Sequence, residues 1–249
     1  MRAVPYAGLC LMRYVSLFSG MEAAHLAWEA LGWTCVGVAE IEPVACAVLA
    51  YHLPHIPNLG SVTEITDGQV AALGPFDVLI GGSPCQDLSV AGRRAGLAGA
   101  RSSLFHHQMR IFNAARHFCG TRWLIWENVP GAFSSNEGRD FAVVVGAMAG
   151  CDLPVPSNGW GSEGIALGDN GLVEWSVLDA QWFGVRRLTP RECERLQGVP
   201  DDWTLTPNAK GKPMADGPRY KLLGNSFAVP VVRWIGTKIA AAHRMSEAT

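Results

Sequence analysis

Short apolar runs alternate with helix-like segments through the first part of the chain, and this alternation constrains the fold more than any other feature. Residues 14–18 and 34–39 are apolar runs typical of buried strands. Residues 22–31 and 43–52 follow them, with apolar residues at helical spacings. Strand, helix, strand, helix implies parallel strands joined by crossover helices. The sequence therefore predicts an α/β fold, a parallel sheet with flanking helices.

The same pattern continues towards the C-terminus. Further strands are predicted at residues 77–82, 123–127 and 175–178, and further helices at 104–118, 139–149 and 228–243. Loops rich in small and polar residues are predicted at 86–103 and 151–171. Thr189 and Glu192 have capping-box spacing, with Pro190 at the first helical position and Gly198 beyond the end, so another short helix is predicted there.

Composition narrows the class of protein. Hydrophobic residues make up 49% of the 249 and the formal net charge is −2, so a nucleic-acid partner would need a local positive patch. The seven cysteines are an odd number without a CxxC pair, which favours a reduced cytoplasm and no metal site. No stretch reaches the length of a membrane span. Residues 1–12 receive no function, and Met12 is an alternative start.

The first chemical candidate is a cysteine at a strand end. Cys85 follows the apolar run 77–82, and the Gly-Gly-Ser-Pro before it is poor core material. A thiolate that adds to C6 of cytosine turns C5 into a carbon that can attack a methyl donor. The alternative, a buried inert cysteine, is accepted for the other six.

A carboxylate ends the next apolar run. Glu127 follows residues 123–126, and neighbouring apolar residues would raise its pKa so that it could act as an acid towards N3 of a cytosine ring. Asn128 could orient this carboxylate or hold the exocyclic amine of the ring. A glutamate that only caps the next turn is the alternative.

A cofactor site is predicted at the first two strand ends. The turn Phe18-Ser19-Gly20-Met21 would place backbone N–H groups beneath a ligand. Glu40 ends the second strand, where Rossmann-like sheets place a carboxylate for ribose hydroxyls. Ile41 could pack against an adenine ring.

Arginines gather in the loop after Cys85. Arg93, Arg94 and Arg101 lie among glycines and suit closure over a phosphate backbone. His106 and His107 would favour a Cys/His hydrolase, but they begin a predicted helix and are interpreted as surface or packing residues.

Together these motifs resemble the DNA cytosine-5 methyltransferases of phages and bacteria. Phe18-Ser19-Gly20, Pro84-Cys85-Gln86, Glu127-Asn128-Val129 and Gly224-Asn225-Ser226 occur in the order that this family shows. The resemblance implies a Rossmann-like fold that uses S-adenosylmethionine, with Cys85 attacking C6, Glu127 at N3 and a cytosine flipped out of duplex DNA. It also implies a restriction-modification or phage self-protection role.

The resemblance assigns roles to residues in three groups. The catalytic group is Cys85, Glu127, Asn128, Pro84 and Arg187; Arg187 would stand in for a catalytic arginine of the family, although its position fits the helix after the recognition region better. The cofactor group is Phe18, Ser19, Gly20, Met21, Glu40, Ile41, Ser61, Val62, Leu104, Asn225 and Ser226. The DNA-binding group is Gln86, Ser89, Arg93, Arg94 and Arg101.

Three departures from the family pattern stand out. Glu22 occupies a place where the family usually has glycine, and Ser61 occupies the place of an aspartate that contacts the adenine amine. The third departure is a missing target-recognition region, because residues 179–185 run directly into residues 186–192. The domains are therefore expected to be a catalytic core at 13–185 and a returning segment at 186–249. The second lobe is expected to be small or missing, and an edge of the sheet open.

The interpretation is a methyltransferase that modifies cytosine at C5 in DNA. Its rivals are an inactive remnant that binds cofactor only, half of a split enzyme whose recognition subunit is a separate polypeptide, and more remotely a tRNA cytosine-5 methyltransferase. Most remote is the Cys/His hydrolase. Without the recognition lobe little remains to read base edges, so sequence selection is the function expected to suffer.

Overall fold

The computed structural model describes residues 11–83, 103–178, 188–208 and 211–247. Its centre is a parallel sheet in the order β2-β1-β3-β4. In register, Tyr14 lies between Cys35 on one side and Val78 on the other, and Val78 lies beside Trp123. The strands are β1 (Arg13–Leu17), β2 (Thr34–Ala39), β3 (Val78–Gly81) and β4 (Trp123–Trp126). The predicted α/β class is confirmed.

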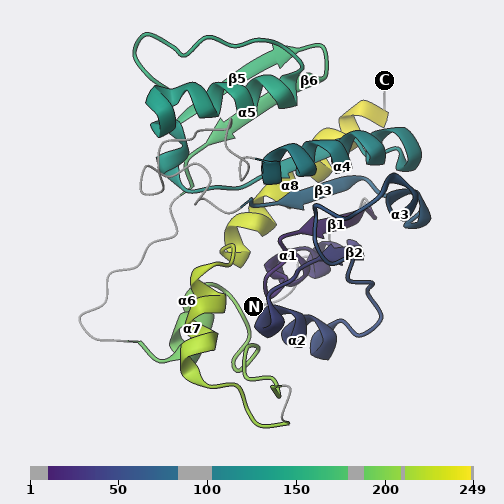
Figure 1. Cartoon of the computed structure of the whole chain (residues 1–249), viewed down its shortest axis with the longest axis vertical. Coiled ribbons are helices and arrows are strands. Elements are labelled where there is room, and N and C mark those ends of the chain that lie inside the picture. The colour runs from purple at the N-terminus through teal and green to yellow at the C-terminus, as the bar shows by residue number, and fades with distance from the viewer. Residues whose placement is uncertain (1–10, 84–102, 179–187, 209–210, 248–249) are drawn as a thin grey trace.

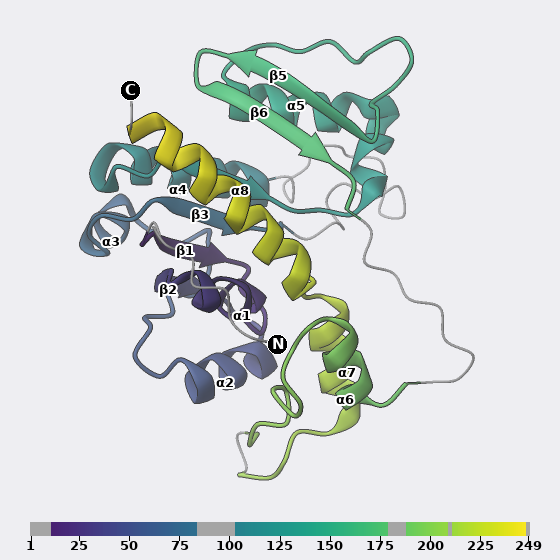
Figure 2. The same ribbon diagram turned by 180° about the vertical axis from the view of Figure 1, so that it is seen from behind.

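Helices cover both faces of this sheet (Figures 1 and 2). Because side chains alternate along a strand, Tyr14 faces one layer and Val15 the other. The first layer holds α1 (Ala23–Trp28, continued by a 3₁₀ turn, Glu29–Leu31), α2 (Pro43–His52) and α8 (Val229–Glu247). The second holds α3 (Asp67–Ala72) and α4 (Ser103–Cys119). Among the described residues, no helix is long and apolar enough to cross a membrane.

An antiparallel hairpin beyond β4 corrects one prediction. Two short 3₁₀ turns, Pro130–Phe133 and Ser135–Gly138, lead from β4 into α5 (Arg139–Ala149). The segment predicted as a loop at 151–171 then contains β5 (Glu163–Gly168), and the strand predicted at 175–178 is β6 (Gly171–Ser176). A two-residue turn, Asp169-Asn170, joins them, a typical hairpin connection. The inner face of the hairpin packs on α5 through Trp175 and Phe141.

The sheet ends at β4 within the described part of the chain. All four β4 residues are half-buried, whereas all four β3 residues are buried. The hairpin pairs only with itself among the described strands and does not extend the central sheet. An open edge was the expectation for a chain without the later strands of the family.

The C-terminal segment returns to the core through α6 (Pro190–Leu196), α7 (Asp216–Gly224) and α8. The predicted capping box is confirmed, because Thr189 N donates to Glu192 Oε2 (2.9 Å) and Glu192 N donates to Thr189 Oγ1 (3.3 Å). The Trp28 indole donates to the carbonyl of Val232 on α8 (2.8 Å). The domain boundaries at 12/13 and 185/186 remain predictions.

Trp203 makes a second junction between the C-terminal segment and the core. Its indole Nε1 donates to the carbonyl of Met21 (3.2 Å), directly after β1. The His52 ring stacks on Trp203 at 3.5 Å between centroids, and His52 Nε2 donates to the Trp203 carbonyl (2.8 Å). The returning segment is therefore anchored beside the turn that follows β1.

Candidate active site

The carboxyl ends of the parallel strands surround a cleft of about 760 Å³, a volume within the usual range for small-molecule sites. Four segments that each follow a strand contribute to its wall, and α7 closes the opposite side. Open α/β sheets bind ligands at this edge. The residues of the predicted site that line the cleft are Phe18, Gly20, Glu40, Ile41, Ser61, Val62, Leu104, Glu127, Asn128, Asn225 and Ser226.

The turn after β1 presents backbone to the cleft. Phe18 and Gly20 line it, both with left-handed backbone (φ +53° and +55°). Ser19 is buried, and its hydroxyl donates to the Ser16 carbonyl (2.9 Å) while accepting from Ala39 N (3.1 Å). Met21 is fully buried in the core. Ser19 and Met21 therefore support the turn from beneath, and their side chains do not line the cleft.

Glu40 fixes the geometry at the end of β2. Its Oε2 accepts from Gly20 N (2.8 Å), and its Oε1 accepts from the backbone N–H groups of Ile41 (2.7 Å) and Glu42 (2.8 Å). A carboxylate offers about four lone-pair positions, so Oε2 keeps one acceptor for a ligand hydroxyl. Glu40 thus joins the β1 turn to the β2 turn and still faces the cleft.

Apolar side chains form the neighbouring wall. Ile41 is 69% exposed beside Glu40, and Val62 and Leu104 also line the cleft. An exposed isoleucine at a cleft suits one face of a planar base. The Ser61 hydroxyl is 2.7 Å from Thr63 Oγ1 and also lies on the wall.

Glu127 follows β4 directly and lines the same cleft. Glu127 is exposed to the cleft, and the atoms packed around its carboxyl group partly desolvate that group and so raise its pKa. Gly82 makes room for it, since a Cβ added there would lie 2.8 Å from Glu127 Oε2. Sequence reasoning missed Gly82 as a site residue, although the two consecutive glycines at 81 and 82 were a signal.

Trp126 and Asn128, on either side of Glu127, both hold Ser83. The Trp126 indole donates to Ser83 Oγ (3.1 Å), and Asn128 Nδ2 donates to the Ser83 carbonyl (3.1 Å). Asn128 Oδ1 also accepts from Val129 N (2.9 Å). The end of β3 is therefore fastened to the end of β4, and Ser83 lies one residue before Pro84 in the sequence.

The wall opposite β1 and β2 comes from α7 and the turn after it. Asn225 and Ser226 line the cleft there. Lys221 Nζ, on α7, lies 3.3 Å from Glu42 Oε2 and so links α7 to the beginning of α2. Lys221 and Glu42 also line the cleft and were not predicted, because no local motif marks them.

Eight residues of the predicted site lie outside the described residues. They are Pro84, Cys85, Gln86, Ser89, Arg93, Arg94, Arg101 and Arg187. Their roles remain predictions from the sequence.

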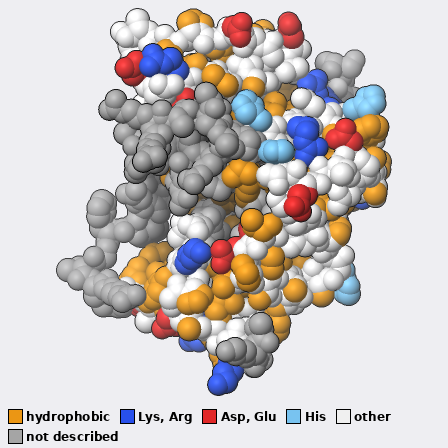
Figure 3. Space-filling model, viewed as in Figure 1, with side chains coloured by type: hydrophobic (Ala, Val, Ile, Leu, Met, Phe, Trp, Pro, Cys, Tyr) orange, Lys and Arg blue, Asp and Glu red, His pale blue; other side chains and the backbone are white. Residues whose placement is uncertain are grey.

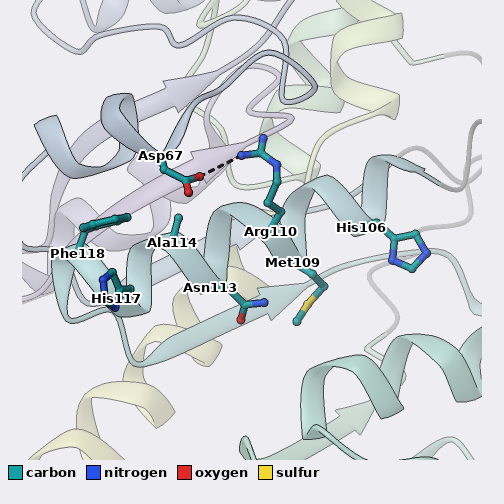
Figure 4. A pocket seen from close by; sticks show the side chains of 8 residues that line it. All are labelled: Asp67, His106, Met109, Arg110, Asn113, Ala114, His117 and Phe118. Carbon is teal, nitrogen blue, oxygen red and sulfur yellow. Dashed lines mark hydrogen bonds and ion pairs between the residues drawn. The ribbon is translucent and has the colours of Figure 1, made fainter.

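A second, shallower pocket of about 530 Å³ lies along the outer face of α4 (Figure 4). It is lined by His106, Arg110, Asn113 and His117, and Figure 3 shows histidine and basic side chains gathered over this part of the surface. Arg110 is engaged structurally, since it donates to the carbonyls of Ile65 (2.6 Å) and Val62 (3.3 Å) and pairs with Asp67 (3.4 Å). It therefore braces the segment that carries Val62 to the main cleft.

Within the described ranges, no group of three or more His, Cys, Asp or Glu side chains could hold a metal ion. Five cysteines in those ranges are free thiols: Cys35, Cys46, Cys119, Cys151 and Cys193.

The fold and the cleft at its strand ends define a Rossmann-like methyltransferase. Residues 12–185 and 157–241 match the model of the C-5 cytosine-specific DNA methylase family. Because these matches cover most of the chain, the protein belongs to that family, whose members are methyltransferases.

Curated relatives are longer than this chain. It is 36% identical over 207 residues to a DNA N-6-adenine-methyltransferase of Escherichia phage P1; the match covers 72% of this chain and 27% of that protein. It is 26% identical over 298 residues to the Type II methyltransferase M2.BsuMI of Bacillus subtilis (strain 168), and the match covers 92% of this chain and 75% of that protein. Since 92% of this chain is about 229 residues, about 70 positions within the matched stretch of the Bacillus protein have no counterpart here. This difference is compatible with a missing region.

A solved structure shares the fold. The Dnmt2 methyltransferase of S. pombe superimposes with a TM-score of 0.60 at 15% identity, covering 92% of this chain and 98% of that one. At this identity the likeness supports the fold alone.

Proposed function

We propose that this protein transfers a methyl group from S-adenosylmethionine to C5 of cytosine in DNA. One observation carries the proposal: the Glu127 carboxyl, with a raised pKa, lines the same cleft as the Glu40 carboxylate. An acid for the base and an acceptor for a ribose hydroxyl therefore line one cleft. Membership of the family supports methyl transfer to DNA, and the cytosine mechanism is the finer part of the proposal.

The residues of the cleft fit S-adenosylmethionine. The free acceptor position on Glu40 Oε2 would take a ribose hydroxyl, and Ile41 would pack on the adenine face. Phe18 and Gly20 of the β1 turn, with Asn225 and Ser226 opposite, line the part of the cleft that would take the amino-acid end. The cofactor, when bound, supplies an electrophilic methyl group.

Cys85 is assigned the nucleophilic step. Its thiolate would add to C6 of the flipped cytosine and electron density would move to C5. C5 would then take the methyl group as the sulfonium–methyl bond breaks, and S-adenosylhomocysteine would leave. Loss of the C5 proton and elimination of the thiolate then restore the aromatic ring and the free enzyme. The hydrogen bonds from Trp126 and Asn128 to Ser83 support this role, because they fix the backbone one residue before Pro84.

Glu127 is assigned the role of acid at N3 of the ring. Negative charge grows on N3 as the thiolate adds, and a protonated carboxyl donates to it best. The desolvation that raises the Glu127 pKa favours this protonated form. Gly82 leaves the space in which the carboxyl lies.

The residues that we propose to contact DNA are assigned from the amino-acid sequence alone. Gln86, Ser89, Arg93, Arg94 and Arg101 are proposed to contact the duplex, and Arg187 to take part in catalysis. Duplex DNA with a flipped cytosine is the proposed substrate. A cytoplasmic location and a restriction-modification or self-protection role complete the proposal.

A different target base is the main alternative, because the phage P1 relative is named for N6-adenine methylation. This chain spans 27% of that protein, so its name describes a chain that lies mostly outside the match. The family model matched by this chain is the cytosine-specific one, which favours cytosine.

The test is methyl transfer from labelled S-adenosylmethionine to unmethylated duplex DNA, followed by identification of the modified nucleoside by mass spectrometry. We expect 5-methylcytosine, no signal with Cys85→Ser, and full signal with the control Cys151→Ser. Cofactor binding by Cys85→Ser should be nearly unchanged. N6-methyladenine as product, or transfer that survives Cys85→Ser, would overturn the mechanism.

Two further outcomes of this experiment distinguish the alternative functions. Transfer to tRNA but not to duplex DNA would identify an RNA enzyme. Cofactor binding without transfer to either acceptor would identify a remnant or half of a split enzyme, and transfer restored by a co-purifying polypeptide would identify the latter.

A further inference from the structure

A carboxyl group is buried in the core directly behind the cofactor cleft. Glu22 is 1% exposed and lies between α1 and the β1–β2 pair. Tyr14 and Ser16, which point to the same face of β1, are equally buried. Cys35 lies opposite Tyr14 on β2. These four side chains form a polar cluster inside an apolar layer.

Three side chains of this cluster lack well-formed hydrogen bonds. Neither oxygen of Glu22 makes one, and the hydroxyls of Tyr14 and Ser16, which lie beside it, make none either. Glu22 has left-handed backbone (φ +62°), which is uncommon for a residue with a side chain. Buried polar atoms are nearly always paired, so the cluster requires an explanation.

Protonation of Glu22 provides an explanation for these buried polar groups. Burial raises the pKa of Glu22 to about 7, although the nearby Ser16 and Tyr14 hydroxyls act in the opposite direction. The pKa values of Tyr14 and Cys35 are raised by the same burial, so both stay neutral near pH 7. Burial lowers the pKa of His25, on α1, so it stays neutral there too. On α8, Arg233 donates to the carbonyls of Leu26 and Ala27, at the other end of α1.

Backbone bonds connect Glu22 to the cleft. Glu22 N donates to the Ser19 carbonyl (2.8 Å), which closes the turn whose Phe18 and Gly20 line the cleft. Gly20 N donates in turn to Glu40. A charge on Glu22 would have to leave the apolar layer, and the turn would have to open with it.

We propose that Glu22 is a proton-linked positioning residue: its neutral carboxylic acid holds the β1 turn in the geometry that binds cofactor, and its ionisation opens that turn. This inference rests on the proposed use of the cleft for S-adenosylmethionine. It assigns a role to the glutamate that stands where the family usually has glycine.

The test measures binding of S-adenosylhomocysteine by calorimetry between pH 6 and pH 8. This product lacks the sulfonium charge, so attraction between that charge and a carboxylate does not contribute. If only the protonated form binds, the Kd of the wild type rises about tenfold over this range. Glu22→Gln, a neutral mimic, should bind with a nearly constant Kd. The control Glu29→Gln, an exposed glutamate that follows α1, should keep the wild-type profile.

Equal pH profiles for the wild type and Glu22→Gln would overturn the proposal. Tyr14→Phe gives a second, independent variant: it removes a hydroxyl that favours ionisation, so the rise in Kd should move to higher pH. An unmoved profile in this variant would contradict the role of the cluster.

Stability of the free protein distinguishes this proposal from the proposed function. The folded-state pKa of Glu22 lies above the unfolded value of about 4.5, so its contribution to stability is present at low pH and is lost as pH rises towards 7. The folding equilibrium constant should fall about 300-fold through this group, and Glu22→Gln should remove that fall. Failure of the wild type to bind at any pH would refute the cofactor site and the positioning role together, while the stability profile would still report a buried neutral acid.

Discussion

Replacing Glu194 with glutamine should destabilise the packing of α6 on α7, the helix that forms one wall of the cofactor cleft. Glu194 is 0% exposed, and its carboxylate accepts four hydrogen bonds. Asp202 N donates to Oε2 (2.7 Å), and Thr204 N (2.9 Å) and Thr204 Oγ1 (2.5 Å) donate to Oε1. The buried Arg219 completes the set, with Nη2 at 3.2 Å from Oε1.

The size of the effect follows from the burial of both charges. Glutamine keeps the shape but removes the buried carboxylate that pairs with Arg219, and its NH₂ group would face a backbone donor. Removing one partner of a buried pair costs about 3–5 kcal/mol when the other charge is left uncompensated. Arg219 keeps Asp202 (3.4 Å) and Asp216 (3.8 Å), so we expect the lower end, about 3 kcal/mol. For a chain of this size, each kcal/mol lowers Tm by about 2–4 °C, so Glu194→Gln should lower it by about 6–12 °C.

The assay is urea unfolding with a matched control. Arg195 lies on the same helix and makes an ion pair with Asp201 in contact with solvent, so Arg195→Gln should change stability far less. The double variant Glu194→Gln with Arg219→Met removes both charges but keeps an amide oxygen for the backbone donors of Asp202 and Thr204, so it should recover part of the loss. A Glu194→Gln protein no less stable than the Arg195→Gln control would refute the argument that this pair holds the wall together.

Two other variants test the cleft itself. Gly82→Ala places a Cβ 2.8 Å from Glu127 Oε2, so the flexible carboxyl must move. The rate of methyl transfer in a single turnover should fall about 100-fold, while binding of S-adenosylhomocysteine should be nearly unchanged. An unchanged transfer rate would contradict the role of Glu127. Trp203→Phe removes the indole donor to Met21 and should weaken binding of S-adenosylhomocysteine, measured by calorimetry, about three- to tenfold. The control Trp234→Phe, on the exposed side of α8, should bind normally. Equal affinities would show that the Trp203 junction does not support the turn.

Local sequence patterns predicted those parts of the fold that depend on interactions between residues close together in the chain. The strands and helices of the sheet have strong periodicity, and parallel strands bring their carboxyl ends to one edge whatever the loops between them do. Glu40 and Glu127, about ninety positions apart, could therefore be predicted to face one site, and both line the cleft. The capping box at Thr189 was equally local.

Features that depend on tertiary packing escaped prediction. The hairpin at 163–176 was interpreted largely as loop because its glycines and polar residues resemble one, and its large apolar residues Ile165 and Leu167 face outwards. Burial of Glu22 requires α1 to cover β1 and β2, which no window of sequence contains. Lys221 approaches Glu42 only after the C-terminal segment has returned to the core.

The structure separates the chemistry of this protein from its choice of DNA sequence. Glu40 and Glu127 are positioned by β2 and β4, and these strands do not depend on any lobe that would read bases. Phosphate contacts carry affinity, whereas base edges carry specificity. The chain alone should therefore methylate cytosines at similar, low rates in duplexes that differ only in the bases around the target. Sequencing of the modified positions after long incubation measures this. A strong preference for one short site would show that the chain itself reads bases, and it would refute the expectation that sequence selection suffers without a recognition lobe.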